Sequence, residues 1–187
     1  MKKEKGDYGY RTSYRRMRFC IAAVLAAAIL AQLGARFLTD NEAAKNILTV
    51  MAILTVLPMA NVASPLLAAW RYKTPPVEFY EKVKPYEERA RILYDLILTT
   101  KDDIVPADAA AVHPNGVFVY CPVSLKGNRA EKAVNELFAK NRAGLTVKLI
   151  SDEKSFFRRL DSLKPLDSYE DDGTVEYGAD LLKTLSM

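Results

Sequence analysis

Two apolar stretches decide the fold, FCIAAVLAAAILAQLGARFL (Phe19–Leu38) and ILTVMAILTVLPMANVASPLLAAW (Ile47–Trp70). Arg36 is the only charged residue in either stretch. At a rise of about 1.5 Å per residue, each would form a helix about 30 Å or more in length, which is enough to cross a bilayer's hydrocarbon core. The sequence therefore predicts transmembrane helices at 19–38 and 47–70, joined by a short extracytoplasmic loop at 39–46.

Positive charge lies on one side of these predicted spans. The first 18 residues carry seven cations against two acids, and Arg71 and Lys73 follow the second stretch, whereas the loop holds one cation, Lys45. Lys and Arg are enriched on the cytoplasmic side of membrane spans. We therefore expect a plasma-membrane protein with a basic cytoplasmic tail (1–18) and both termini in the cytoplasm. A cleaved signal peptide is the alternative for the first stretch, but its basic region and apolar span are both long for one.

The flanking cations also predict a partner. Each Lys or Arg near an anionic leaflet contributes about 1 kcal/mol to membrane binding. Nucleic acid is the alternative for a basic, aromatic-bearing tail, but the chain from Arg71 onward has 18 basic and 19 acidic side chains and lacks a cationic footprint. We expect anchoring to the anionic inner leaflet by Lys2, Lys3, Lys5, Arg11, Arg15, Arg16, Arg18, Arg71 and Lys73.

Small residues recur every fourth position in both spans, a spacing that allows close approach of helix backbones in lipid. The pattern predicts that the spans pack on each other, or on a second copy in a homodimer; chance spacing in an alanine-rich span is the alternative. The positions are Ala23, Ala27, Ala31, Ala35, Ala60, Ser64 and Ala68.

The remaining residues, 75–187, predict a small cytoplasmic α/β domain with the order α-β-β-α-β-α-α. An Asn-Gly pair, which favours the positive φ angles of a tight turn, joins the first two strands. The predicted elements are a helix at Val77–Thr100 divided at Pro85, strands at Val105–Val112 and Val117–Cys121, a helix from Asn128 to Arg142, a strand at Leu145–Ile150, a helix capped by Ser151 and Asp152, and a helix at Thr174–Leu185.

Few residues in this domain suggest chemistry. His113 is the only histidine, so one chain can assemble neither a histidine-based catalytic triad nor a multi-histidine metal site. The sequence contains no glycine-rich nucleotide loop and no paired C-x-x-C. It predicts no cofactor and no metal site, and we expect no disulfide between Cys20 and Cys121 because a cytoplasmic domain keeps thiols reduced.

One segment, ADAAAVHPNGVFV (Ala107–Val119), resembles the hairpin of NERD-type domains of the restriction-endonuclease-like superfamily. The resemblance implies metal-dependent phosphodiester cleavage by an Asp, together with a Glu and a Lys that lie five and seven residues beyond the turn Gly. Asp108 is in register with that Asp, but the other two positions are Cys121 and Val123. Without the second carboxylate and the Lys we expect no nuclease activity, and Asp108 is the one weak catalytic candidate. An independent origin of such a hairpin is the alternative.

The C-terminal residues Ser162–Met187 also resemble an uncharacterised group of two-span membrane proteins from anaerobic Gram-positive bacteria, which implies no activity. These observations together favour a membrane-anchored cytoplasmic domain of a bacterium that binds or scaffolds a protein partner and is not an enzyme. Two alternatives stay open: a degenerate metal-dependent nuclease-like domain that retains Asp108, and an accessory subunit of a larger membrane complex.

Overall fold

The computed structural model describes residues 3–100, 103–123, 129–170 and 172–187. The chain forms two compact units. One comprises 12–72, and the other combines 1–11 with 73–187. The first unit is a helical hairpin, and the second is an α/β domain. The predicted helix cap at Asn128 lies outside the described residues.

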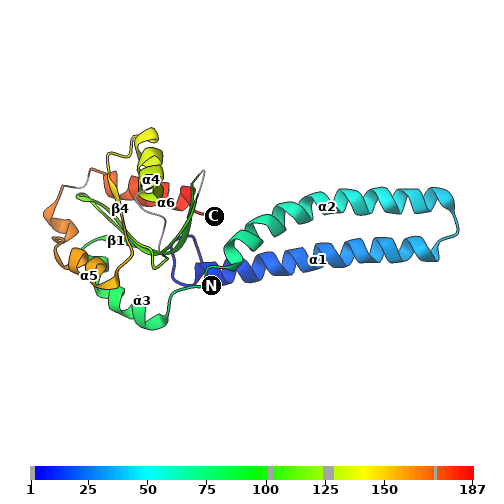
Figure 1. Ribbon diagram of the computed structural model, residues 1–187, viewed down its shortest axis with the longest axis horizontal. Coiled ribbons are helices and arrows are strands. Elements are labelled where there is room, and N and C mark those ends of the chain that lie inside the picture. The colour runs from blue at the N-terminus through cyan, green and yellow to red at the C-terminus, as the bar shows by residue number, and fades with distance from the viewer. Residues whose placement is uncertain (1–2, 101–102, 124–128, 171) are drawn as a thin grey trace. The chain divides into compact units, whose positions relative to one another are not determined.

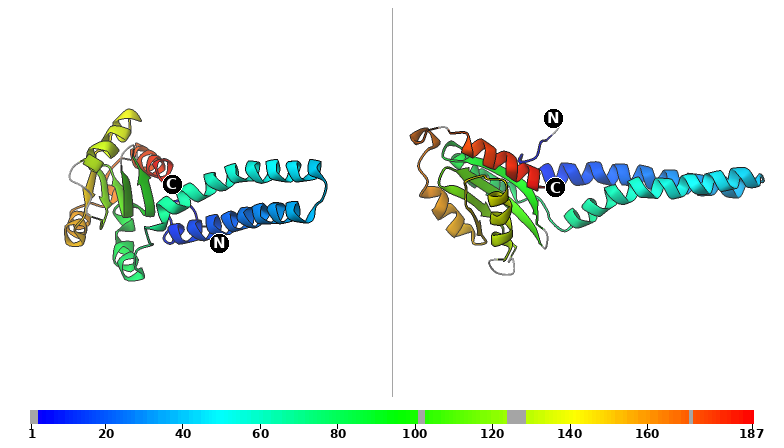
Figure 2. Two further views of the ribbon diagram at one scale, coloured as in Figure 1. Left: turned by 45° about the vertical axis from the view of Figure 1, so that its right-hand side comes forward. Right: turned by 90° about the horizontal axis from the view of Figure 1, so that it is seen from above.

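Two long helices, α1 (Tyr10–Leu38) and α2 (Glu42–Trp70), form the hairpin and run side by side (Figures 1 and 2). Both are long and apolar enough to cross a membrane. Their C-terminal ends are those predicted, but α1 begins nine residues earlier than Phe19. The start of α2 is fixed by Asn41, whose side chain accepts hydrogen bonds from the backbone N–H groups of Ala43 and Ala44.

The hairpin presents apolar side chains to its surroundings. Leu30 is 70% exposed and Phe37 is 87% exposed. Five of the seven small residues predicted to pack the spans are also exposed, while Ala35 and Ala68 are half-buried. These positions therefore form no buried seam within the hairpin, and their role in helix packing stays a prediction. The five exposed positions are Ala23, Ala27, Ala31, Ala60 and Ser64.

A four-stranded mixed sheet forms the centre of the α/β domain. Its order is β1 (Arg91–Thr99), β2 (Ile104–His113), β3 (Gly116–Tyr120) and β4 (Val147–Ile150). β2 is antiparallel to both its neighbours, and β4 is parallel to β3. The hairpin predicted for Val105–Val112 and Val117–Cys121 is thus confirmed as the pairing of β2 with β3. Gly116 has φ 130°, and a Cβ there would lie 2.9 Å from the carbonyl oxygen of Thr146, so the position requires glycine.

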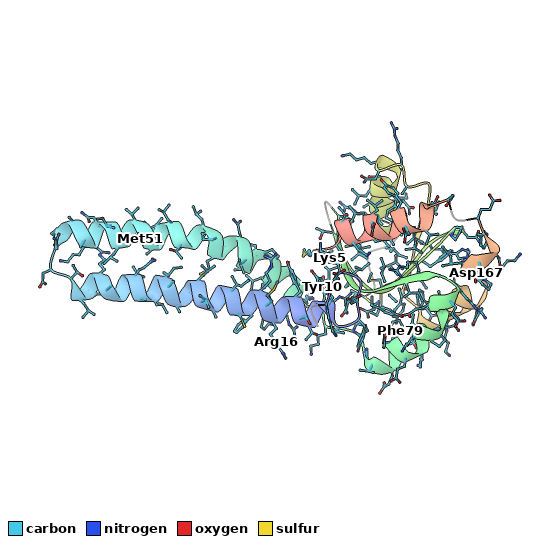
Figure 3. All side chains as sticks on the ribbon, turned by 180° about the vertical axis from the view of Figure 1, so that it is seen from behind. Lys5, Tyr10, Arg16, Met51, Phe79 and Asp167 are labelled. Carbon is cyan, nitrogen blue, oxygen red and sulfur yellow. The ribbon has the colours of Figure 1, made fainter. Side chains whose placement is uncertain are left out.

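Helices cover both faces of this sheet (Figure 1). α4 (Arg129–Lys140) and α6 (Thr174–Leu185) pack on one face through side chains such as Phe138 and Leu182. α3 (Val77–Val83) and α5 (Glu153–Asp161) pack on the other through Phe79 and Phe156, and Figure 3 marks Phe79 on α3. Each large buried side chain contributes about 1.5–3 kcal/mol to folding. Two short 3-10 helices, η1 (Lys84–Glu88) and η2 (Leu166–Ser168), complete the domain.

The prediction of a helix over Val77–Thr100 is wrong for its second half. Only 77–83 is α-helical, and Arg91–Thr99 is the first strand. The domain order is therefore α-β-β-β-α-β-α-α instead of α-β-β-α-β-α-α. The seven central residues of β1 are all buried because helices cover both faces of the sheet. A strand buried on both faces has no period-two alternation, so its apolar run can be mistaken for one side of a helix.

The first part of the predicted basic tail (1–18) packs on the α/β domain. Residues 3–9 lie along the outer edge of β1, where the backbone of Gly6 forms an antiparallel bridge with Tyr94. The ring of Tyr8 stacks on Tyr80 at 4.4 Å. The Lys5 ammonium donates to the carbonyl of Ser186, 2.6 Å away, just beyond α6 (Figure 3). This segment therefore belongs to the domain and covers its first strand.

Candidate functional site

The weak catalytic candidate, Asp108, lies in the middle of β2 and stands opposite Asp95 of β1. β1 and β2 pair Tyr94 with Ala109 and Leu96 with Ala107, so the two aspartates between these pairs face each other. The aspartates themselves are not paired in the sheet. Asp95 has φ 57°, a left-handed backbone conformation that Asp tolerates better than most residues. The two strands are thus distorted at the point where two carboxyl groups meet.

In both strands the alternation of side chains between the two faces of the sheet is interrupted at this pair. Leu93 and Leu96 belong to the same buried cluster, although side chains three positions apart normally lie on opposite faces of a strand. Ala110 and Ala107 of β2 show the same offset. The interruption lies at Asp95, between Tyr94, which belongs to the cluster under α3 and α5, and Leu96, which belongs to the cluster under α4 and α6.

The guanidinium of Arg11 fills the space beside the two aspartates. Its Nη1 donates to the Oδ1 of Asp108 at 2.7 Å. Its Nη2 donates to the backbone carbonyl oxygens of Leu96 and Ala107 at 2.7 and 2.6 Å, and Nη1 also reaches the carbonyl of Lys73 at 2.9 Å. The Nε lies 3.6 Å from the Oδ1 of Asp95. Arg11 is buried, with 5% of its surface exposed. Its hydrogen bonds join the N-terminal part of the chain to β1 and β2.

Asp95 ties two further segments to this cluster. Its Oδ2 accepts a hydrogen bond from the backbone N–H of Gly9 at 2.7 Å and one from the hydroxyl of Thr74 at 3.0 Å. Its side chain is fully buried. The Arg11–Asp95–Asp108 cluster therefore holds the N-terminal segment, the residues that precede α3, and the centre of the sheet together.

The cluster contains two carboxyl groups and one guanidinium. Burial raises the pKa of Asp95, and the charge of Arg11 opposes that shift. Burial likewise raises the pKa of Asp108, again against the charge and hydrogen bond of Arg11. Removal of one partner from a buried ion pair costs about 3–5 kcal/mol because a charge is left uncompensated. Arg11 is thus the counter-ion on which the burial of both carboxyl groups depends.

The surroundings of Asp108 do not fit the divalent metal that the NERD-type resemblance implies. Cys121 follows Tyr120, the partner of Ala109, and so stands opposite Asp108. It is buried, and burial raises the pKa of its thiol to about 11, which leaves it protonated and a poor ligand. Val123 has no ligand atom in its side chain. Within the described part of the chain, no group of three or more His, Cys, Asp or Glu side chains could hold a metal ion.

The predicted membrane-anchoring cations occupy different environments. Lys3, Arg16, Arg71 and Lys73 are exposed. The guanidinium of Arg15 lies 5.3 Å from the ring of Trp70, and that of Arg18 lies 4.8 Å from the ring of Tyr14. Arg11 departs from the prediction because its charge is buried against Asp108, and Lys5 is half-buried against α6. Lys2 lies outside the described residues.

His113 is a buried anchor of the β2–β3 turn. Its Nδ1 accepts the backbone N–H of Asn115 at 3.1 Å, so the proton of the neutral ring lies on Nε2, which donates to the carbonyl of Lys164 at 3.1 Å. The ring also meets Tyr169 edge-on, with 5.0 Å between centroids. These contacts use both ring nitrogens, so His113 joins the turn to the segment after α5.

Sequence reasoning missed Asp95 and the pairing of Arg11. The available signal was a lone Asp in the apolar run RILYDLILT, which β1 buries on both faces. A buried carboxyl group needs a counter-charge or several hydrogen-bond donors. The sequence thus indicates that Asp95 needs a partner. It does not indicate that the partner is Arg11, which lies 97 residues from Asp108.

A comparison of the chain with known protein families, curated proteins and solved structures gives no match.

Proposed function

We propose that the chain is a two-span membrane protein whose α/β domain lies in the cytoplasm and binds a protein partner without catalysing a reaction. The apolar length of α1 and α2 supports the spans. Arg15 and Trp70 meet at one end of the hairpin. Trp favours the headgroup layer on either side of a membrane, and cations favour the cytoplasmic side. At the other end of the hairpin Lys45, the single cation of the predicted loop, lies in the first turn of α2 and is paired with Glu42 at 2.8 Å. This asymmetry supports cytoplasmic termini.

Protease protection tests the orientation. Protease added to intact spheroplasts should leave the α/β domain uncut, and the domain should be digested once the membrane is permeabilised with detergent. Digestion of the domain from outside, before permeabilisation, would overturn the proposed orientation.

The observation that carries the non-catalytic assignment is the guanidinium of Arg11 on the Oδ1 of Asp108. A carboxylate that activates a metal-bound water needs free lone pairs and a second hard ligand. The Oδ1 of Asp108 is bonded to Arg11, and the register places the protonated thiol of Cys121 opposite Asp108. The residue is thus used to hold the fold together.

The register of Asp108 with the NERD-type Asp favours one alternative, a nuclease-like enzyme. Full-length protein in mild detergent, assayed with Mg²⁺ or Mn²⁺ on DNA and RNA, decides between the two. We expect no cleavage above that of an Asp108→Asn variant. Metal-dependent cleavage that is lost in Asp108→Asn and kept in Asp167→Asn, the same change at an exposed site, would establish the nuclease and overturn the non-catalytic assignment.

A further inference from the structure

A groove with a volume of about 710 Å³ runs between β4 and one face of α5. The α5 side is formed by Ser155, Arg158, Arg159 and Ser162, whose spacing of three, four and seven residues places them on one stripe of the helix. The β4 side is formed by residues 148–152. Three cations and three hydroxyl groups therefore line a single open groove: Lys148, Arg158, Arg159, Ser151, Ser155 and Ser162.

Two of these cations have no counter-ion among the residues that the structure describes. Lys148 and Arg158 are exposed and make no ion pair there, whereas the guanidinium of Arg159 lies 4.4 Å from the ring of Phe118. The one acid in the lining, Asp152, accepts the backbone N–H of Ser155 and caps α5. The groove thus has three cations against one acid, in a chain that from Arg71 onward has one more acid than bases.

The free edge of the sheet beside this groove is not available for strand addition. The side chain of Asn135 accepts the N–H of Val147 and donates to its carbonyl, both at 2.7 Å. The carboxylate of Glu131 accepts the N–H of Leu149 at 2.9 Å. Because α4 side chains satisfy these outward groups, a partner in the groove would have to bind through its own side chains.

We propose that this groove docks an acidic segment of a protein partner. The proposal rests on the binding role proposed above and names the chemistry of the partner. Carboxylates of the segment would pair with Lys148 and Arg158, and apolar side chains between them would lie on the half-buried Ile150, which packs on the α5 side of the sheet. A long polyanion fits less well, because Asp152 in the lining and Glu153 next to it would repel a continuous phosphate backbone.

Binding of a fluorescent peptide tests the proposal. The full-length chain in nanodiscs of neutral phosphatidylcholine is titrated with a labelled ten-residue Glu/Leu peptide and with the same peptide carrying Gln in place of Glu. We expect saturable, salt-sensitive binding of the Glu peptide only. A Lys148→Glu/Arg158→Glu variant should bind it about tenfold or more weakly, because the variant replaces attraction at two positions by repulsion.

Lys154→Glu is the control, since it reverses one cation on α5 outside the groove lining, half the charge change of the double variant, and should alter the affinity by less than about twofold. Both variants change exposed residues, and equal thermal unfolding would show that they fold. Equal binding of the Glu peptide to wild type and to the groove variant, equal binding of the Gln peptide, or tighter binding to single-stranded DNA or to anionic lipid nanodiscs would each overturn the proposal. These outcomes leave the nuclease test unaffected, so failure of the groove and failure of the non-catalytic assignment are distinguishable.

Discussion

The hairpin and the α/β domain place their polar and apolar side chains in opposite ways. The hairpin exposes large apolar residues such as Leu30 and Phe37, whereas the domain buries Arg11, Asp95 and Asp108. In water the first arrangement would expose apolar surface and the second would desolvate charges. The contrast indicates that the hairpin is suited to lipid, and that the charges in the domain are stable only as a complete cluster.

The largest expected effect comes from removal of Arg11. Arg11→Ala leaves two buried carboxyl groups without their cation and should lower the free energy of unfolding of the domain by about 3–5 kcal/mol. The measurement is the urea dependence of proteolysis of the domain in the full-length protein in detergent. Arg16→Ala, at an exposed position early in the same helix, should change it by less than about 0.5 kcal/mol.

The same cluster allows a sharper version of this test. Combination of Arg11→Met with Asp95→Asn and Asp108→Asn removes all three charges and should recover most of the loss, since uncharged replacements of buried ion pairs are often near neutral. A loss as large as that of Arg11→Ala alone would contradict the account of Arg11 as a counter-ion.

The second effect concerns the hairpin. Leu30→Lys places a charge near the middle of the predicted first span and should cost about 2.5–3.5 kcal/mol of insertion free energy. Val77→Lys makes a similar change at an exposed position of the domain, where it should be nearly neutral. The fraction of protein that stays in the membrane after carbonate extraction measures both. An unchanged fraction for Leu30→Lys would argue that the hairpin does not cross a bilayer.

A smaller effect is expected from His113. Burial lowers its pKa below the ordinary value of 6.5, so the unfolded chain binds more protons than the native one below that pH. The contribution of His113 to stability is therefore present above about pH 6.5 and is lost as the pH falls toward the folded pKa. The raised pKa values of Asp95 and Asp108 act in the opposite direction, so the comparison must be made between variants.

His113→Gln isolates this contribution. The amide can still accept from Asn115 but does not titrate, so the melting temperature of wild type should fall further between pH 7 and pH 5 than that of the variant. Parallel pH profiles for the two proteins would show that protonation of His113 is not resisted by the fold.

Sequence patterns predicted best the elements whose ends carry local signals. The last helix is predicted at Thr174–Leu185 and lies there, and α1 and α2 end at Leu38 and Trp70, the last residues of the two predicted spans. β1 was missed because burial on both faces removes the alternation by which a strand is identified. The Arg11–Asp95–Asp108 cluster was missed because its members come from three distant segments, and because a cation in a basic tail is ordinarily read as a surface charge.

The central claim is that the carboxylate of Asp108 is held by Arg11 and is not a metal ligand. The most direct test is a titration of the full-length protein in detergent with Mn²⁺. Binding is measured as the loss of the electron paramagnetic resonance signal of the free ion. The account predicts that wild type and Asp108→Asn give superimposable titrations with only weak, non-saturating binding. A stoichiometric Mn²⁺ site in wild type that disappears in Asp108→Asn would contradict it.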